Sequence, residues 1–239
     1  MLPKSNDYNA LRDSFHWDIP ARLNMAVQVC DAWAVQDPQR TAIIDLTGRQ
    51  RRDVTYGDLW ALSRRVELAL LERHVAQGDR VGVLLSQSPL TAAAHIAIWR
   101  MGAISVPLFK LFQRQALETR VRDAGLRVVV SDGEGAALLE GLDLTVVQEG
   151  DLPDSTQAGQ VADTGPEDPA VLIYTSGTTG APKGALHGHR VLTGHLPGVE
   201  MSHDFLGQEG DCLWTPADWA WIGGLFDVLM PGLALGVPV

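Results

Sequence analysis

Strand-like and helix-like segments alternate between residues 80 and 147, and this alternation restricts the fold more than any other feature of the sequence. Arg80–Leu85 is rich in β-branched residues, and Pro89–Met101 follows as an apolar helix with Gly102 just past its end. The order then repeats, with strands at Ile104–Pro107, Arg127–Ser131 and Thr145–Val147 and helices at Gln113–Asp123 and Glu134–Glu140. Strands that alternate with helices imply a parallel sheet. We therefore expect an α/β fold with a helix-wrapped, largely parallel sheet.

The residues before this series predict a helix, a hairpin and a second helix. Asn24–Ala34 spaces its apolar side chains at helical intervals, and Thr41–Asp45 and Arg52–Val54 are typical of two paired strands. Thr55 is a good N-cap, and Asp58 three residues later completes a capping box. The helix that begins there carries three arginines that we expect on a solvated face: Arg64, Arg65 and Arg73.

A buried strand that empties into a glycine-rich loop is the second informative feature. Ala170–Tyr174 is apolar and bounded by Pro169. The ten residues that follow hold three glycines (Gly177, Gly180, Gly184), four hydroxyl side chains (Thr175, Ser176, Thr178, Thr179) and Lys183. Glycine lets backbone N–H groups turn toward a ligand, hydroxyls add donors, and lysine supplies a positive charge that suits phosphate. The loop therefore predicts a cradle for polyphosphate.

The spacing of this loop differs from that of a Walker A loop. Lys183 follows Pro182 and precedes Gly184, so no hydroxyl stands after the lysine to hold magnesium. A flexible Gly/Thr linker is the alternative interpretation. The buried strand upstream and the stiff Pro182–Lys183 pair argue against a linker.

Residues Tyr174–Gly184, YTSGTTGAPKG, resemble the phosphate-loop signature of the superfamily of AMP-forming acyl-CoA synthetases, luciferases and peptide-synthetase adenylation domains. The resemblance implies that residues 1–239 are the N-terminal part of the AMP-binding large domain, with 148–169 as a surface connection inside it. It implies ATP, Mg²⁺ and coenzyme A as cofactors or substrates, and catalytic roles for Thr175 and Lys183. The implied ATP-binding residues are Thr175, Ser176, Gly177, Thr178, Thr179, Gly180, Lys183 and Gly184.

A tryptophan-rich stretch, Thr215–Gly224, predicts a second part of the site. Trp221 stands just before Gly223 and Gly224, where a helix is expected to begin. This arrangement resembles the family segment that walls the carboxylic-acid pocket, so Trp221, Gly223 and Gly224 are the candidate pocket residues. The order Ala217, Asp218, Trp221 resembles the acetate and medium-chain branch, whereas we expect Trp214 to fill the core.

The resemblance implies an acid–CoA ligase that converts a carboxylic acid and ATP to an acyl-adenylate and then to an acyl-CoA. The family's later Tyr-Gly-x-Thr-Glu signature, its ribose-binding aspartate, its hinge and its C-terminal lid lie outside this sequence. We therefore expect a truncated chain that is inactive alone and that self-associates through an unfinished sheet edge. Two alternatives stay open, namely a non-catalytic nucleotide-binding fragment and an amino-acid adenylation module.

Charge, cysteines and histidines narrow the partners. A formal net charge of -10 argues against a nucleic-acid partner. Cys30 and Cys212 fit no metal or disulfide framework, which favours free thiols in the cytoplasm. His187 and His189 lack an acid or cysteine at ligand spacing, so we expect no metal site.

Neither end of the chain predicts a membrane or export segment. Met1–Asp18 is charged and lacks an apolar core, so it does not resemble a signal peptide. Ile222–Val239 is weakly polar but is interrupted by Asp227 and Pro231. It therefore favours a buried helix, turn and strand over a membrane span.

Overall fold

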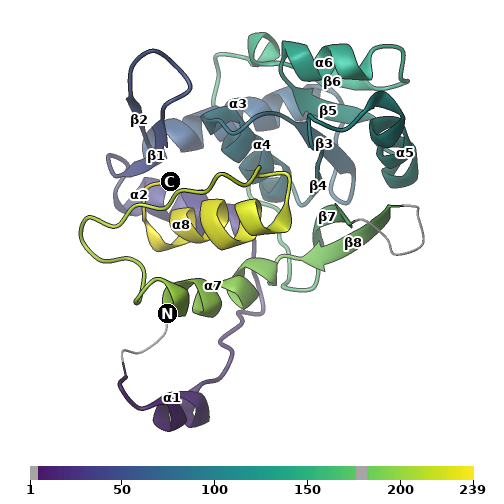
Figure 1. The fold of residues 1–239 in the computed structure, drawn as a ribbon. Coiled ribbons are helices and arrows are strands. Elements are labelled where there is room, and N and C mark those ends of the chain that lie inside the picture. The colour runs from purple at the N-terminus through teal and green to yellow at the C-terminus, as the bar shows by residue number, and fades with distance from the viewer. Residues whose placement is uncertain (1–4, 176–181) are drawn as a thin grey trace.

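The computed structural model describes residues 5–175 and 182–239. It contains a six-stranded sheet, which helices wrap (Figure 1). The strand order is β6-β5-β3-β4-β7-β8, parallel throughout except for the antiparallel pair β7-β8. The predicted α/β fold with a largely parallel sheet is thus confirmed. The strands are β3 (Arg80–Leu84), β4 (Ile104–Pro107), β5 (Val128–Ser131), β6 (Thr145–Val147), β7 (Pro169–Thr175) and β8 (Lys183–Gly188).

Helices cover both faces of this sheet. Alternate side chains of a strand point to opposite faces, so Val81 and Val83 of β3 pack in one apolar cluster and Leu84 packs in another. The first cluster includes α3 (Tyr56–Glu72) and α4 (Pro89–Arg100), and the second includes α5 (Arg114–Ala124) and α6 (Gly133–Leu139). The sheet therefore lies between two helical layers. These layers cover its faces, so a site can form at the ends of the strands.

Local signals set the ends of these helices. The predicted capping box is confirmed, because Thr55 Oγ1 accepts from the Asp58 N–H and Asp58 Oδ2 accepts from the Thr55 N–H, each at 3.1 Å. α5 ends at Gly125, which has a φ of +61° that glycine adopts without strain. Gly102, with a φ of +68°, ends α4 in the same way.

A small hairpin and seven further helical segments complete the fold of residues 5–175 and 182–239. β1 (Thr41–Asp45) and β2 (Arg52–Thr55) pair antiparallel, as predicted. The backbone of Val239 bonds to Ile44 and Ala42 of β1. The remaining helices are α1 (Tyr8–Ser14), η1 (Val27–Asp31), α2 (Ala32–Gln36), η2 (Glu149–Asp151), α7 (Val191–Ser202), η3 (Gly224–Leu229) and α8 (Met230–Leu235). Within the described ranges, no helix has the length and apolar character needed to cross a bilayer.

The expected solvated face of arginines on α3 is wrong. Arg64 is buried and donates to the carbonyl oxygens of Thr156, Ala158 and Gly159. Arg65 donates to the carbonyl oxygen of Pro153 at 2.7 Å. An irregular segment leaves carbonyl groups without a strand or helix partner, and arginine offers several donors on one side chain. The two arginines therefore bind the connection between β6 and β7 to α3.

Candidate functional site

The carboxyl ends of the parallel strands bring polar residues from distant parts of the chain to one edge of the sheet. Ser86 follows β3, Lys110 follows β4, Asp132 follows β5, and Thr175 ends β7. Open α/β sheets bind their ligands at this edge, because the loops that leave it surround a common crevice. The predicted phosphate loop therefore begins at the edge where a ligand is expected.

The β7–β8 pair supplies the two ends of that loop. Thr175 lies opposite Lys183 in the antiparallel register, and Tyr174 lies opposite Gly184. Both Thr175 and Lys183 are exposed, and the Thr175 hydroxyl donates to the Lys183 carbonyl oxygen at 3.5 Å. The structure thus brings together the two residues predicted to be catalytic. The other predicted loop residues, Ser176, Gly177, Thr178, Thr179 and Gly180, lie outside the described residues.

Packing holds the base of the loop against α5. The Tyr174 hydroxyl donates to Asp123 Oδ2 at 2.5 Å, and the Arg120 guanidinium lies 5.7 Å from the Tyr174 ring. A Cβ atom on Gly184 would come within 2.8 Å of Leu172 Cδ1 and 3.5 Å of Tyr174 Cε1. Glycine at position 184 therefore lets β8 lie close to the side chains of β7.

Trp221 lies at the same edge of the sheet, in contact with the loop between β4 and α5. Its ring centroid is 5.4 Å from that of Phe109 and 5.9 Å from that of Phe112. The side chain is 39% exposed, so one part of the ring is free to face a ligand. The predicted pocket residue and the predicted phosphate loop are therefore both placed at the carboxyl edge.

Gly223 and Gly224 differ in what surrounds them. A Cβ atom on Gly224 would lie 2.4 Å from the Asp218 carbonyl oxygen, whereas one on Gly223 would lie 3.5 Å from Asp227 Oδ2. Gly224 is therefore required by the close approach of the backbone at Asp218. The helix does begin here, as expected, and continues through η3 into α8.

The expectation that Trp214 fills the core is wrong, because its side chain is 79% exposed. Trp219 takes the buried position instead, with 7% exposure. Residues 211–220 contain no helix or strand, so the hydrophobicity of a side chain there does not by itself decide which way it points.

Lys110 is a charged residue of this edge that the sequence did not single out. Its Nζ donates to Ser86 Oγ at 3.2 Å, to Asp132 Oδ2 at 2.9 Å and to Glu134 Oε2 at 2.6 Å. Burial opposes the charged form of Lys110, but the hydrogen bonds that its ammonium group donates to Glu134 and Asp132 outweigh this effect and raise the pKa of Lys110. The available signal was a lysine between two phenylalanines just after a strand end.

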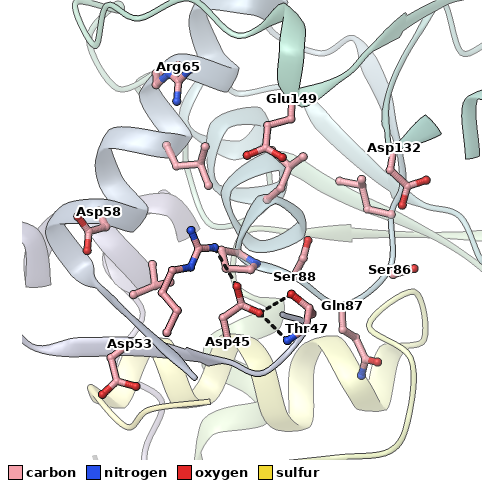
Figure 2. Close-up of a pocket in the computed structure, with 16 residues that line it drawn as sticks. Asp45, Thr47, Asp53, Asp58, Arg65, Ser86, Gln87, Ser88, Asp132 and Glu149 are labelled. Carbon is pink, nitrogen blue, oxygen red and sulfur yellow. Dashed lines mark hydrogen bonds and ion pairs between the residues drawn. The ribbon is translucent and has the colours of Figure 1, made fainter. Parts of the chain in front are cut away.

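A polar cavity of about 750 Å³ lies between the β1–β2 hairpin, α3 and the β3–α4 loop (Figure 2). Ser86 and Asp132, which accept hydrogen bonds from Lys110, also line this cavity. Asp45 is its best-anchored acid, since it accepts from the Thr47 N–H and hydroxyl and from Arg52. More carboxylates than arginines line the cavity. The arginines are Arg52 and Arg65, and the carboxylates are those of Asp45, Asp53, Asp58, Asp132 and Glu149. Its charge therefore repels a phosphate, which leaves the β7–β8 pair as the better place for polyphosphate.

The described residues offer no metal centre. Within 5–175 and 182–239, no group of three or more His, Cys, Asp or Glu side chains is arranged to hold a metal ion. His189 is buried, and its Nδ1 accepts a hydrogen bond from the Met25 N–H at 3.1 Å. That bond has a structural role, because it joins the start of the helix at Met25 to the turn before α7.

Comparison with known proteins points to one family. A family model described as "AMP-binding enzyme" matches residues 30–239. An acetyl-coenzyme A synthetase of Halorhodospira halophila is 31% identical over 92% of this chain and 41% of its own length. One of Penicillium chrysogenum is 30% identical over 92% of this chain and 38% of its own length. The chain thus spans about two fifths of the length of these curated relatives.

Solved structures agree with this match. An acyl-CoA synthetase of Brucella canis superposes with a TM-score of 0.82 and 26% identity, covering 97% of this chain and 47% of that protein. A fatty acid AMP ligase of Legionella pneumophila superposes with a TM-score of 0.80 over 90% of this chain and 38% of that protein. At 18% identity the latter likeness concerns the fold alone.

Proposed function

This chain belongs to the AMP-binding enzyme family. We propose that it forms the nucleotide-binding part of an AMP-forming acid–CoA ligase. In the first step a carboxylate oxygen attacks the α-phosphorus of ATP, which enters with Mg²⁺, and pyrophosphate leaves. In the second step the thiol of coenzyme A attacks the acyl carbonyl carbon of the adenylate, and AMP leaves as the thioester forms. The proton of the thiol is released to solvent or a base. The partners are then a small carboxylic acid, ATP and coenzyme A, in the cytoplasm.

The facing pair Thr175 and Lys183 at the carboxyl edge is the observation that carries this proposal. Negative charge accumulates on pyrophosphate as it leaves, and donors already aimed at that charge lower the barrier. Lys183 supplies a positive charge and Thr175 a hydroxyl. Ser176, Gly177, Thr178, Thr179 and Gly180 are proposed to add backbone and hydroxyl donors. Loss of one such donor costs about 3 kcal/mol, roughly a hundredfold in rate.

Trp221, Gly223 and Gly224 are proposed to wall the pocket for the acid. The position of Trp221 beside Phe109 and Phe112 supports this role, because the loop that holds these rings leaves the same edge of the sheet at which β7 ends with Thr175. Ligand pockets are lined mainly by apolar and aromatic side chains with a few polar groups, which matches this wall. The acetyl-coenzyme A synthetases among the relatives favour a short or medium acid over an amino acid.

The test combines nucleotide binding with pyrophosphate exchange. Calorimetric titration with Mg·ATP is expected to show binding by the wild-type chain and a loss of at least tenfold in affinity for Lys183→Ala. Arg12→Ala is the matched control, because Arg12 is an exposed cation on α1, which lies away from the sheet (Figure 1). Carboxylate-dependent exchange of pyrophosphate into ATP is then measured, with the full-length protein that carries this sequence, over acetate, medium-chain acids and amino acids.

The outcomes separate the alternatives. Exchange with acetate or medium-chain acids supports the acid–CoA ligase, and exchange with amino acids alone supports an adenylation module. Binding that depends on Lys183 without any exchange supports a non-catalytic nucleotide-binding chain. Absence of binding by the wild-type chain overturns the proposed nucleotide site.

A further inference from the structure

In the loop between β4 and α5, a charged side chain is largely buried and the apolar side chain next to it is exposed. The side chain of Lys110 is only 13% exposed, whereas its neighbour Leu111 is 80% exposed. Lysine is almost never buried unless it is paired, and leucine is among the most often buried residues. Apolar burial therefore does not explain the inward position of Lys110, and its polar contacts do.

Those contacts join the ends of three neighbouring strands. Lys110 follows β4, and its ammonium group donates to Ser86 after β3 and to Asp132 after β5. Asp132 is held in turn as the N-cap of α6, since its Oδ1 accepts from the Gly135 N–H at 2.9 Å. Glu134 completes the set, but its side chain is 85% exposed and adds less to the energy. Lys110 is thus anchored on fixed points of the sheet edge.

The residues on either side of Lys110 hold Trp221. The Phe109 ring is tilted against Trp221, and the Phe112 ring meets it edge-on. Phe112 is held from behind by the Arg120 guanidinium, which lies 3.9 Å from its ring centroid. Aromatic pairs at such separations favour particular geometries, so a displaced Phe109 or Phe112 would move Trp221.

A second link ties the same region together. Gln87 Nε2 donates to the Ala217 carbonyl oxygen at 2.8 Å, which connects the β3–α4 loop to the turn before Trp221. Ser86, the neighbour of Gln87, is one of the acceptors of Lys110. The lysine therefore bears on Trp221 along two routes, one through the aromatic rings and one through the β3–α4 loop.

We propose that Lys110 is a positioning residue that sets the place of Trp221 and so the fit of the carboxylic acid. The proposal rests on the proposed function, in which Trp221 walls the acid pocket. Each of the three ammonium protons of Lys110 has a protein acceptor, so Lys110 acts through Phe109 and Phe112. The nucleotide loop begins at a different strand, β7, and should be unaffected.

The first test follows Trp221 without requiring turnover. Lys110→Met keeps an unbranched side chain of similar length and removes the charge. It is expected to change the near-ultraviolet circular dichroism and to increase acrylamide quenching of tryptophan fluorescence. Both differences are expected to vanish when the same substitution is made in a Trp221→Phe background. Lys110→Arg, which keeps the charge and the donors, is expected to restore most of the wild-type signal.

Two further variants keep the test decisive. Ser86→Ala removes a single acceptor and is expected to produce a smaller change of the same sign, even if Lys110→Met fails to fold. Arg122→Met is the matched control, because it removes an ion pair with Glu118 that lies on the exposed side of α5. It is expected to leave the tryptophan signals unchanged.

The second test separates the acid from the nucleotide. In the pyrophosphate-exchange assay, Lys110→Met is expected to raise the KM for the acid by roughly tenfold to a hundredfold, the effect of moving a positioning group by about 1 Å. The KM for ATP is expected to stay within about twofold of wild type. Equal changes in both constants, or a tryptophan difference that persists in the Trp221→Phe background, would overturn the positioning role. Absence of exchange by the full-length protein that carries this sequence would instead count against the proposed function, whereas the spectroscopic test does not depend on exchange.

Discussion

The hydroxyl group of Tyr174 donates a hydrogen bond to Asp123 Oδ2 at 2.5 Å, and this bond joins the end of β7 to helix α5. Burial, together with the adjacent Asp123 carboxylate, raises the pKa of Tyr174, so the phenol stays protonated and remains a donor. Tyr174 immediately precedes Thr175, where the predicted phosphate loop begins. The base of the loop is therefore attached to a helix that covers the sheet.

Replacement of Tyr174 by phenylalanine tests this attachment. The ring is retained and only the hydroxyl is lost, so the free energy of unfolding is expected to fall by about 1 kcal/mol. The loss is expected to be constant between pH 6 and 9 (roughly), because the raised pKa keeps the phenol neutral over that range. Urea unfolding measures it, with Tyr8→Phe on the exposed helix α1 as the control. A cost no larger than that of the control would contradict the attachment.

The two glycines near Trp221 provide a matched pair. Gly224→Ala is expected to lower the free energy of unfolding by about 1–3 kcal/mol, because the added methyl group meets the Asp218 backbone and forces a shift. Gly223→Ala meets only the end of a flexible side chain at an ordinary contact distance. It is expected to be neutral or to stabilise the helix by up to about 1 kcal/mol. Thermal unfolding of both variants measures the difference. Equal effects of the two substitutions would contradict the close approach of Gly224 to the Asp218 backbone.

A buried charge network near α3 and α4 predicts a large loss on truncation. Glu67 Oε2 accepts from Arg64 Nη1 at 2.6 Å and lies 3.2 Å from Arg100 Nε, and both arginines are buried. Glu67→Ala leaves two buried positive charges without this partner and is expected to cost about 3–5 kcal/mol. Glu118→Ala, which breaks a largely exposed pair with Arg122, is expected to cost about 1 kcal/mol or less. Denaturant unfolding measures the free energy of unfolding of both variants. Similar losses for Glu67→Ala and Glu118→Ala would show that the buried network adds no more stability than an exposed ion pair.

Acid sensitivity is expected from a buried histidine of α4. His95 stacks on Trp99 with ring centroids 5.5 Å apart, and burial lowers the pKa of His95 to about 3. Between that value and the unfolded pKa of about 6.5, the unfolded chain binds more protons, so stability falls as the pH is lowered through this window. From pH 7.5 to 5.0 this group alone removes about 2 kcal/mol.

The comparison of His95→Gln with wild type isolates this effect. The variant is expected to be less stable at pH 7.5 because the site loses packing, but the gap to wild type is expected to narrow by about 2 kcal/mol at pH 5.0. His16→Gln, at an exposed position, serves as the control and is expected to follow wild type. A gap that stays constant across the two pH values would show that His95 does not carry the proton dependence.

Local patterns in the sequence were sufficient for most of the fold. The capping box at Thr55 and Asp58 and the glycine after α5 involve neighbours within a few residues, so their physics is contained in the sequence itself. The alternation of strand and helix likewise implied the parallel sheet. For the site, the glycine and hydroxyl pattern identified the segment whose two ends, Thr175 and Lys183, face each other.

Strand β8 shows where local patterns stop. Its sequence, KGALHG, contains two glycines and has little preference for a strand, and no strand was predicted there. It is extended because β7 offers a row of backbone partners from Thr175 back to Pro169. The decisive interactions belong to the neighbouring strand and cannot be found in the segment alone.

The sequence by itself determined most of the strands and helices, β8 excepted, and it determined which loop suits a phosphate, because neighbouring residues decide those properties. Only the tertiary structure decided that Lys110 and Arg64 point inward and that Trp214 points outward. A charged side chain is buried when acceptors from other segments surround it: Ser86 and Asp132 for Lys110, and the backbone of residues 156–159 for Arg64. Those acceptors are distant in sequence, so the position of each charge follows from the completed fold.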